Sequence, residues 1–280
     1  MRALARGTLT LLIVVGLFAA AVWGVITLLE DRGVIATNSC TAYLPDGTSY
    51  ALSAEQADNA ALIAAIPTQR GMPARAATIG LATAMQESSL RNIDYGDRDS
   101  VGLFQQRPSQ GWGTVEEIMD PVYSAGIFYD HLAHLDGYEG MEITVAAQRI
   151  QRSAFPDAYA QHEGMARAFA SSLTGHSPAA LTCDLPESDG DLGLIVERLE
   201  RDFLASGAVA DGGTLTIEAA AVLTHVNAET ASWSVGQWAV ATASETGITG
   251  VRVGDQQWER GSREWVTAGT PAPEGTVEVW

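Results

Sequence analysis

An uncharged, mostly apolar stretch at residues 8–29 limits the possible architecture of this chain more than any other feature. As a helix rising about 1.5 Å per residue it would be about 33 Å long, enough to cross the hydrocarbon core of a bilayer. Arg2 and Arg6 precede the stretch, and this arginine bias predicts that residues 1–7 stay in the cytoplasm. The sequence therefore predicts a single-pass protein of the cell membrane, with the bulk of the chain outside the cytoplasm.

A cleaved signal peptide is the alternative interpretation of the same stretch. The apolar region of a signal peptide is normally shorter, and a small-x-small cleavage site follows it. Here residues 28–31 read Leu-Leu-Glu-Asp, which does not fit such a site. We therefore favour an uncleaved anchor, followed by a stalk over residues 30–52.

The charge of the chain excludes several classes of function. Its 34 acidic and 16 basic residues give a formal net charge of −18, and every basic residue is Arg. The absence of Lys excludes Schiff-base chemistry and a P-loop lysine. The sequence has no cluster of basic residues that could neutralise the phosphates of a nucleic acid, so we expect no nucleic-acid partner. The histidines and cysteines do not show metal-ligand spacing, so we expect no metal and no other cofactor.

The chain has only two cysteines, Cys40 and Cys183. If the bulk of the chain lies outside the membrane, an even pair predicts a disulfide. The two residues lie on either side of a predicted helical segment, residues 53–175, so a bridge would join its ends. Two unpaired buried thiols remain the alternative.

Capping signals and prolines mark the helices of residues 53–175. Ser53 and Thr114 each begin a capping box, and Asp120-Pro121 is a typical helix start. Pro67 is expected to end the first helix. Further helices are expected at residues 73–87, 121–132, 143–151 and 156–173.

Residues 176–191 are rich in Ser, Pro, Asp and Gly and are predicted to be a linker. The remainder, residues 192–280, reads as a small α+β domain. Its expected helices cover residues 194–204 and 233–246, and its expected strands cover residues 214–217, 248–253, 256–260 and 277–280. A chain of residues 36–188 is therefore expected to fold and act without this domain.

One carboxylate, that of Glu87, stands at the end of an alanine-rich helix. Residues 84–89 read Ala-Met-Gln-Glu-Ser-Ser, and a Gly-Leu-Phe-Gln-Gln turn follows at residues 102–106. Cleavage of a glycosidic bond needs a proton donor, and a carboxylic acid serves near neutral pH only if burial raises its pKa. Because an apolar helix precedes Glu87, we expect it to be partly buried and to face a cleft. By itself, however, such a Glu is also compatible with an ordinary surface position.

The two motifs together resemble the active-site core of lysozyme-like lytic transglycosylases, the group of soluble lytic transglycosylases and goose-type lysozymes that cut peptidoglycan strands. Those enzymes carry Glu-Ser at the end of a helix, a polar loop, and then Gly-Leu-Met-Gln. Here Phe104 replaces the Met, and Asp99-Ser100 stands where the family usually has Gly-Ala. The resemblance covers roughly residues 72–175. It implies a lysozyme-like fold with Glu87 as the catalytic acid.

The resemblance also implies a set of substrate-binding residues. Gln105 corresponds to the Gln that lines the cleft in the family. Gln148 lies where the family has the Tyr of an Ala-Tyr-Asn motif. Three aromatic residues are candidates for stacking on sugar rings: Tyr95, Phe104 and Trp112. A core position is an equal alternative for Trp112.

The sequence leaves the second catalytic group open. Glycoside hydrolases usually pair two carboxylates, whereas lytic transglycosylases need one because the sugar's own hydroxyl attacks and leaves an anhydro end. Asp94, Asp97 and Asp99 follow Glu87 closely. Each of them is suited either to positioning a water or to capping turns in the loop. Hydrolysis and transglycosylation therefore both remain possible products of the same site.

The sequence as a whole predicts a mainly α lysozyme-like domain with an N-terminal transmembrane helix and a small C-terminal α+β domain. The expected function is cleavage of the MurNAc–GlcNAc bond of peptidoglycan by the single glutamate Glu87. The expected partners are glycan strands and, through the N-terminal helix, a membrane; the sequence does not indicate a protein partner for the C-terminal domain. The alternative is a non-catalytic peptidoglycan-binding or cell-wall assembly protein that keeps the fold.

Overall fold

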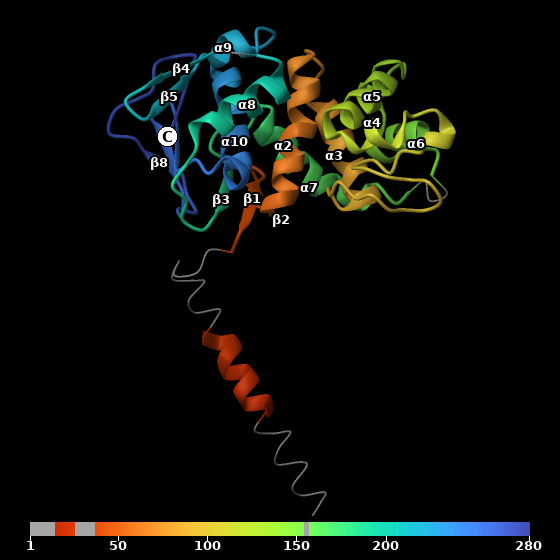
Figure 1. Ribbon diagram of the computed structural model, residues 1–280, viewed down its shortest axis with the longest axis horizontal. Helices are drawn as coiled ribbons and strands as arrows, with labels where there is room; N and C mark the ends of the chain where they lie inside the picture. The colour runs from red at the N-terminus through yellow and green to blue at the C-terminus, as the bar shows by residue number, and fades with distance from the viewer. Residues whose placement is uncertain (1–14, 26–36, 154–156, 206) are drawn as a thin grey trace, which may run out of the picture. The chain divides into compact units, whose positions relative to one another are not determined.

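The computed structural model describes residues 15–25, 37–153, 157–205 and 207–280 (Figure 1). The chain forms two compact units, Met1–Thr37 and Asn38–Trp280. In the first unit the described structure is a helix over residues 15–25.

The predicted transmembrane helix at residues 8–29 needs correction. Residues 8–14 and 26–29 lie outside the described residues, as does the predicted cytoplasmic segment 1–7. Among the helices that the structure describes, none has both the length and the apolar character needed to span a membrane. The structure therefore does not support a single-pass membrane protein.

The second unit begins with a three-stranded antiparallel sheet in the order β2-β1-β3. Its strands are β1 (Ser39–Tyr43), β2 (Ser49–Ser53) and β3 (Leu181–Asp184). Most of the segment predicted as a stalk thus forms a β-hairpin, and the segment predicted as a linker supplies the third strand. Cys40 and Cys183 lie directly opposite each other in the β1–β3 pairing and form the predicted disulfide.

Helices follow the first hairpin for more than a hundred residues. Both predicted capping boxes are present, one formed by Ser53 and Gln56 and the other by Thr114 and Glu117. Asp120 is the predicted N-cap, with Pro121 at the first helical position. The helices are α2 (Ala54–Gln69), α3 (Ala74–Ser88), α4 (Val115–Met119), α5 (Pro121–Ala133), α6 (Ile143–Gln151) and α7 (Glu163–Leu173), with 3₁₀ turns at Pro108–Gln110 (η1), Tyr138–Gly140 (η2) and Ala160–His162 (η3).

Pro67 does not end α2, which continues to Gln69. A proline inside a helix lacks the N–H that would bond the carbonyl four residues earlier, here that of Ile63. The hydroxyl of Tyr129 on α5 replaces this missing donor, with its oxygen 2.7 Å from the Ile63 oxygen. Gly80 on α3 provides the space, because a methyl group there would overlap the Tyr129 hydroxyl. One buried hydroxyl therefore joins α2, α3 and α5.

The C-terminal part of the unit contains a six-stranded antiparallel sheet in the order β4-β5-β9-β6-β7-β8. The strands predicted near residues 214–217, 248–253, 256–260 and 277–280 all belong to it. The helices here are α8 (Leu192–Phe203), α9 (Ala219–Val222) and α10 (Ala228–Thr246), and the strands are β4 (Ala208–Asp211), β5 (Thr214–Ile217), β6 (Gly250–Val253), β7 (Gln256–Glu259), β8 (Val266–Thr267) and β9 (Val277–Val279).

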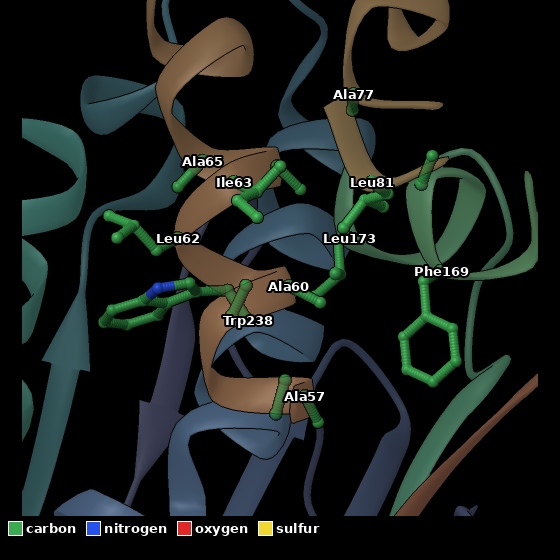
Figure 2. Packing of buried hydrophobic residues seen from close by; sticks show 14 of the residues in the cluster. Ala57, Ala60, Leu62, Ile63, Ala65, Ala77, Leu81, Phe169, Leu173 and Trp238 are labelled. Atoms are coloured by element: carbon green, nitrogen blue, oxygen red, sulfur yellow. The ribbon is translucent and has the colours of Figure 1, made fainter. Parts of the chain in front are cut away.

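Helix α10 lies between the six-stranded sheet and α2, in the middle of the unit (Figure 1). Nearly every residue from Ala231 to Ala243 is buried, as expected of a helix that is covered on all sides. Figure 2 shows Trp238 of α10 beside Leu62 of α2, with Leu81 of α3 and Leu173 of α7 on the other side of α2. Small alanines along α2 allow its neighbours to approach closely.

A buried charged network also connects α8 to this core. Arg198 of α8 bonds Asp58 of α2 at 2.6 Å and Asp202 at 3.1 Å. The indole N–H of Trp238 donates to the same Asp202 carboxylate at 2.9 Å. Elements on both sides of the predicted linker therefore share one core. The predicted fold class is wrong: the described chain combines helices with two antiparallel sheets, and no transmembrane helix is found among its described residues.

Candidate functional site

Glu87 lies in the last turn of α3, and the chain then leaves the helix through Ser89, whose φ of 55° is left-handed. The adjacent Ser88 is buried, and its hydroxyl donates to the Leu103 carbonyl at 2.7 Å. This bond joins the end of α3 to the Gly-Leu-Phe-Gln-Gln turn. The structure thus brings together the two motifs, through a bond between residues that lie fifteen positions apart in the sequence.

Backbone pairing and a glycine fix the shape of this turn. Val101 and Gln106 form a two-way backbone bridge that closes it. Gly102 has a φ of 79°, and a Cβ there would lie 2.7 Å from the Ile118 oxygen, so only glycine fits. The buried Gln106 amide exchanges hydrogen bonds with Ser124 of α5, each at 3.0 Å. The turn is therefore held rigidly between α3 and α5.

The surroundings of Glu87 suit a proton donor. Its side chain is partly buried, and the loss of solvation raises the pKa of the carboxyl group. The Tyr159 hydroxyl donates to Glu87 Oε1 at 2.7 Å, and this bond opposes the shift. Burial and the nearby Glu87 in turn raise the pKa of Tyr159 far above its usual range. Tyr159 therefore keeps its proton and acts as a donor.

The segment that leads into α7 also binds the residue next to Glu87. Gln161 Nε2 donates to Gln86 Oε1 at 3.1 Å, and His162 Nε2 lies 3.0 Å from the same oxygen. Burial lowers the pKa of His162, which favours its neutral form. Three hydrogen bonds, counting that from Tyr159, thus fasten the end of α3 to this segment.

The predicted sugar-binding residues of the loop have different environments. Phe104 is fully buried and stacks on Phe128 with ring centroids 4.4 Å apart, so its ring belongs to the core. Tyr95 is 70% exposed and is available to a ligand. The Gln105 amide donates to the carbonyls of Tyr95 and Gly102 at 3.2 and 3.3 Å. Gln105, itself part of the turn, therefore uses its side chain to hold the shape of the loop.

The other two predicted contacts lie on separate elements. Gln148 of α6 donates to the Ser153 carbonyl at 2.8 Å. Trp112 packs partly buried against the core, with its ring 4.5 Å from that of His131 on α5. The Tyr123 hydroxyl donates to the Trp112 carbonyl at 3.2 Å. These contacts give Trp112 a role in packing.

Asp99 is already occupied by structural contacts. Its carboxylate accepts from Arg107 Nε at 2.8 Å, from the Ser109 N–H at 2.8 Å and from the Ser109 hydroxyl at 3.1 Å. These donors hold the pKa of Asp99 well below its usual range, with Arg107 contributing most. Asp94 and Asp97 are exposed in the same loop. Asp99 thus fixes the loop as an ionised group.

A surface cleft of about 380 Å³ lies elsewhere, between residues 185–189 and the β6–β7 hairpin. Glu187, Asp189 and Glu259 line it together with Arg260, and Glu87 is not among its lining residues. The sequence motifs, the hydrogen bonds and the pKa shift converge at Glu87, away from this cleft. Over the described ranges, no cluster of three His, Cys, Asp or Glu side chains is placed to hold a metal ion.

Sequence reasoning missed the side chain that hydrogen-bonds Glu87, that of Tyr159. The Tyr159 ring is buried, as is common for an aromatic residue among helices, but its hydroxyl reaches the carboxylate. Gln151, three residues after Gln148 on the same helix, donates to the Phe104 carbonyl at 2.7 Å and so joins α6 to the turn. A polar residue at the end of α6 carries no local signal of this contact, since its partner is 47 residues away in sequence.

No protein-family model matches this chain, and no curated protein matches its sequence.

Proposed function

We propose that this protein cleaves the glycosidic bond between MurNAc and GlcNAc in peptidoglycan, with Glu87 as its catalytic acid. One observation carries the proposal: Glu87 is a partly buried carboxyl group with a raised pKa, bonded by Tyr159 and joined through Ser88 to the Gly-Leu-Phe-Gln-Gln turn. The resemblance of these motifs to those of lytic transglycosylases supplies the substrate class.

In the proposed reaction, Glu87 donates its proton to the glycosidic oxygen as the bond from that oxygen to the sugar C1 breaks. The Glu87 carboxylate then accepts a proton from the group that attacks C1. Because the Asp99 oxygens are already bonded to Arg107 and Ser109, they are poorly placed to activate a water. With Asp99 engaged, we propose a route with one carboxylate, in which the sugar's own 6-hydroxyl attacks and forms a 1,6-anhydro end. The exposed Asp94 and Asp97 are the remaining candidates for positioning a water in a hydrolytic route.

Mass spectrometry of products from purified peptidoglycan tests the proposal. The wild type is expected to release fragments with anhydro ends, lighter by one water than hydrolysis products. Glu87→Gln keeps the shape of the side chain but removes the acid, and should slow cleavage by about 10²-fold or more. Glu116→Gln, at an exposed position on α4, is the matched control and should cleave at the wild-type rate.

The same experiment separates the alternatives. Equal rates for Glu87→Gln and the wild type would remove Glu87 from the mechanism. Products with ordinary reducing ends would replace transglycosylation by hydrolysis. If the wild-type chain releases no fragments but sediments with peptidoglycan, then the non-catalytic binding function is the correct one.

A further inference from the structure

The segment that carries Tyr159 is joined to α3 by hydrogen bonds whose direction the contacts determine. Gln161 Nε2 donates to the Ala158 carbonyl at 3.1 Å and to Gln86 Oε1 at 3.1 Å. A carbonyl only accepts, so the Ala158 contact fixes which end of the Gln161 amide is the nitrogen. Gln86 must therefore present its oxygen, and His162 Nε2, 3.0 Å from that oxygen, must carry a hydrogen.

His162 uses its ring for this contact and not for the helix that follows it. It is the residue before α7, yet its side chain does not cap that helix. Its partly buried ring is neutral, because burial lowers its pKa. The contact with Gln86 therefore assigns it the tautomer with hydrogen on Nε2. Three donors from residues 159–162 thus meet two consecutive acceptors at the end of α3, the side-chain oxygens of Gln86 and Glu87.

We propose that Gln86 is a positioning residue of the candidate site: its amide oxygen holds residues 158–162 against α3 and so keeps the Tyr159 hydroxyl on Glu87. The meaning of this contact for catalysis rests on the proposed function. Glu87 is placed by α3 itself, whereas Tyr159 comes from a segment 72 residues away in sequence. Its hydroxyl reaches the carboxyl only while that segment stays docked, because a hydrogen bond weakens steeply as its geometry is lost.

Nuclear magnetic resonance titration of the intact chain tests the proposal without a cleavage assay. The ¹³C signal of the Glu87 carboxyl is assigned by its loss in Glu87→Gln. A donor to a carboxylate favours the ionised form, so loosening the Tyr159 bond raises the pKa of Glu87. In Gln86→Met, which keeps the length of the side chain but not the amide, the Glu87 titration should move to higher pH. Gln110→Met, at an exposed position in η1, is the matched control and should leave it in place.

A double-mutant cycle shows whether Gln86 acts through Tyr159. In Tyr159→Phe the hydroxyl is absent, so adding Gln86→Met should not move the Glu87 titration any further. An equal movement in both backgrounds would mean that Gln86 acts on Glu87 without Tyr159, and it would overturn the proposal. A Glu87 titration that is unchanged in folded Gln86→Met would do the same.

The His162 ring of the wild type provides a measurement that does not depend on whether a variant folds. Its ¹⁵N signals should show hydrogen on Nε2 and none on Nδ1 in the neutral ring. A neutral ring with its hydrogen on Nδ1 would contradict the donation to Gln86 and overturn the proposal. Failure to cleave peptidoglycan would instead refute the proposed function and leave these contacts intact.

Discussion

Replacing Tyr129 by Phe should destabilise the fold through a single missing hydrogen bond. Pro67 has no N–H for the Ile63 carbonyl, and the Tyr129 hydroxyl fills that position at 2.7 Å. Both Tyr129 and Ile63 are fully buried, so water has no access to the carbonyl once the hydroxyl is lost. A buried acceptor left without a donor costs about 1–3 kcal/mol, and we expect Tyr129→Phe to lower the free energy of unfolding by that amount.

A double-mutant cycle isolates this explanation from a general packing effect. In Pro67→Ala, residue 67 regains an N–H that can reach the Ile63 carbonyl within the helix. The cost of Tyr129→Phe in that background should therefore fall by about 1 kcal/mol. Tyr123→Phe is the control on the same helix: its hydroxyl donates to Trp112 at 3.2 Å, and its cost should not depend on residue 67.

Urea unfolding followed by tryptophan fluorescence measures all these free energies. The wild type, the two single mutants and the double mutant must show the same dependence of the unfolding free energy on urea concentration. Only then do differences between their urea midpoints report differences in stability. An equal cost of Tyr129→Phe in the wild-type chain and in the Pro67→Ala background would refute the reasoning. It would mean that the hydroxyl does not compensate for the proline.

Three further predictions follow from the same structure. Activity should fall as pH rises through the raised pKa of Glu87. Tyr159→Phe removes a donor to the carboxylate, which raises the pKa of Glu87 further, so the fall in activity should move to higher pH. A pH–rate profile of Tyr159→Phe equal to that of the wild type would contradict this prediction. Replacing Cys40 and Cys183 by Ala should lower the free energy of unfolding, measured by urea unfolding, by about 4–5 kcal/mol in the loop-entropy model. An unchanged urea midpoint would show that the disulfide does not constrain the unfolded chain. A chain ending at residue 188 should fail to fold, because it lacks α10 and exposes the face of α2 that Trp238 covers. A native-like circular dichroism spectrum with cooperative thermal unfolding would contradict this prediction.

The result expected for this truncation is the reverse of what the sequence suggested. Residues 176–191 have the composition of a linker, and composition alone favours an independent C-terminal domain. In the structure, β3 lies within this segment and Gln237 of α10 accepts hydrogen bonds from the N–H groups of Ala180 and Leu181. Helix α10 is buried on nearly all sides, so it is part of the common core.

The sequence by itself determined the elements whose signals are local. The capping boxes at Ser53 and Thr114 and the N-cap at Asp120 placed three helix starts correctly. Four strands of the second sheet, near residues 214–217, 248–253, 256–260 and 277–280, were also predicted, whereas β4 and β8 were not. The pairing of Cys40 with Cys183 followed from there being only two cysteines. A helix cap is formed by residues a few positions apart, so its signal is local. With two cysteines, the sequence allows one possible disulfide.

The tertiary structure decided which distant surfaces meet. Nothing local distinguished Gln151 from Gln148, or showed that Phe104 would stack on Phe128 and not face a sugar. The Tyr129 hydroxyl compensates for Pro67 across more than sixty residues, so α2 continues where a local rule ends it. Such contacts depend on which helix faces pack together, and packing is determined by the shape and volume of the whole core, whereas a local pattern reports only on neighbours along the chain.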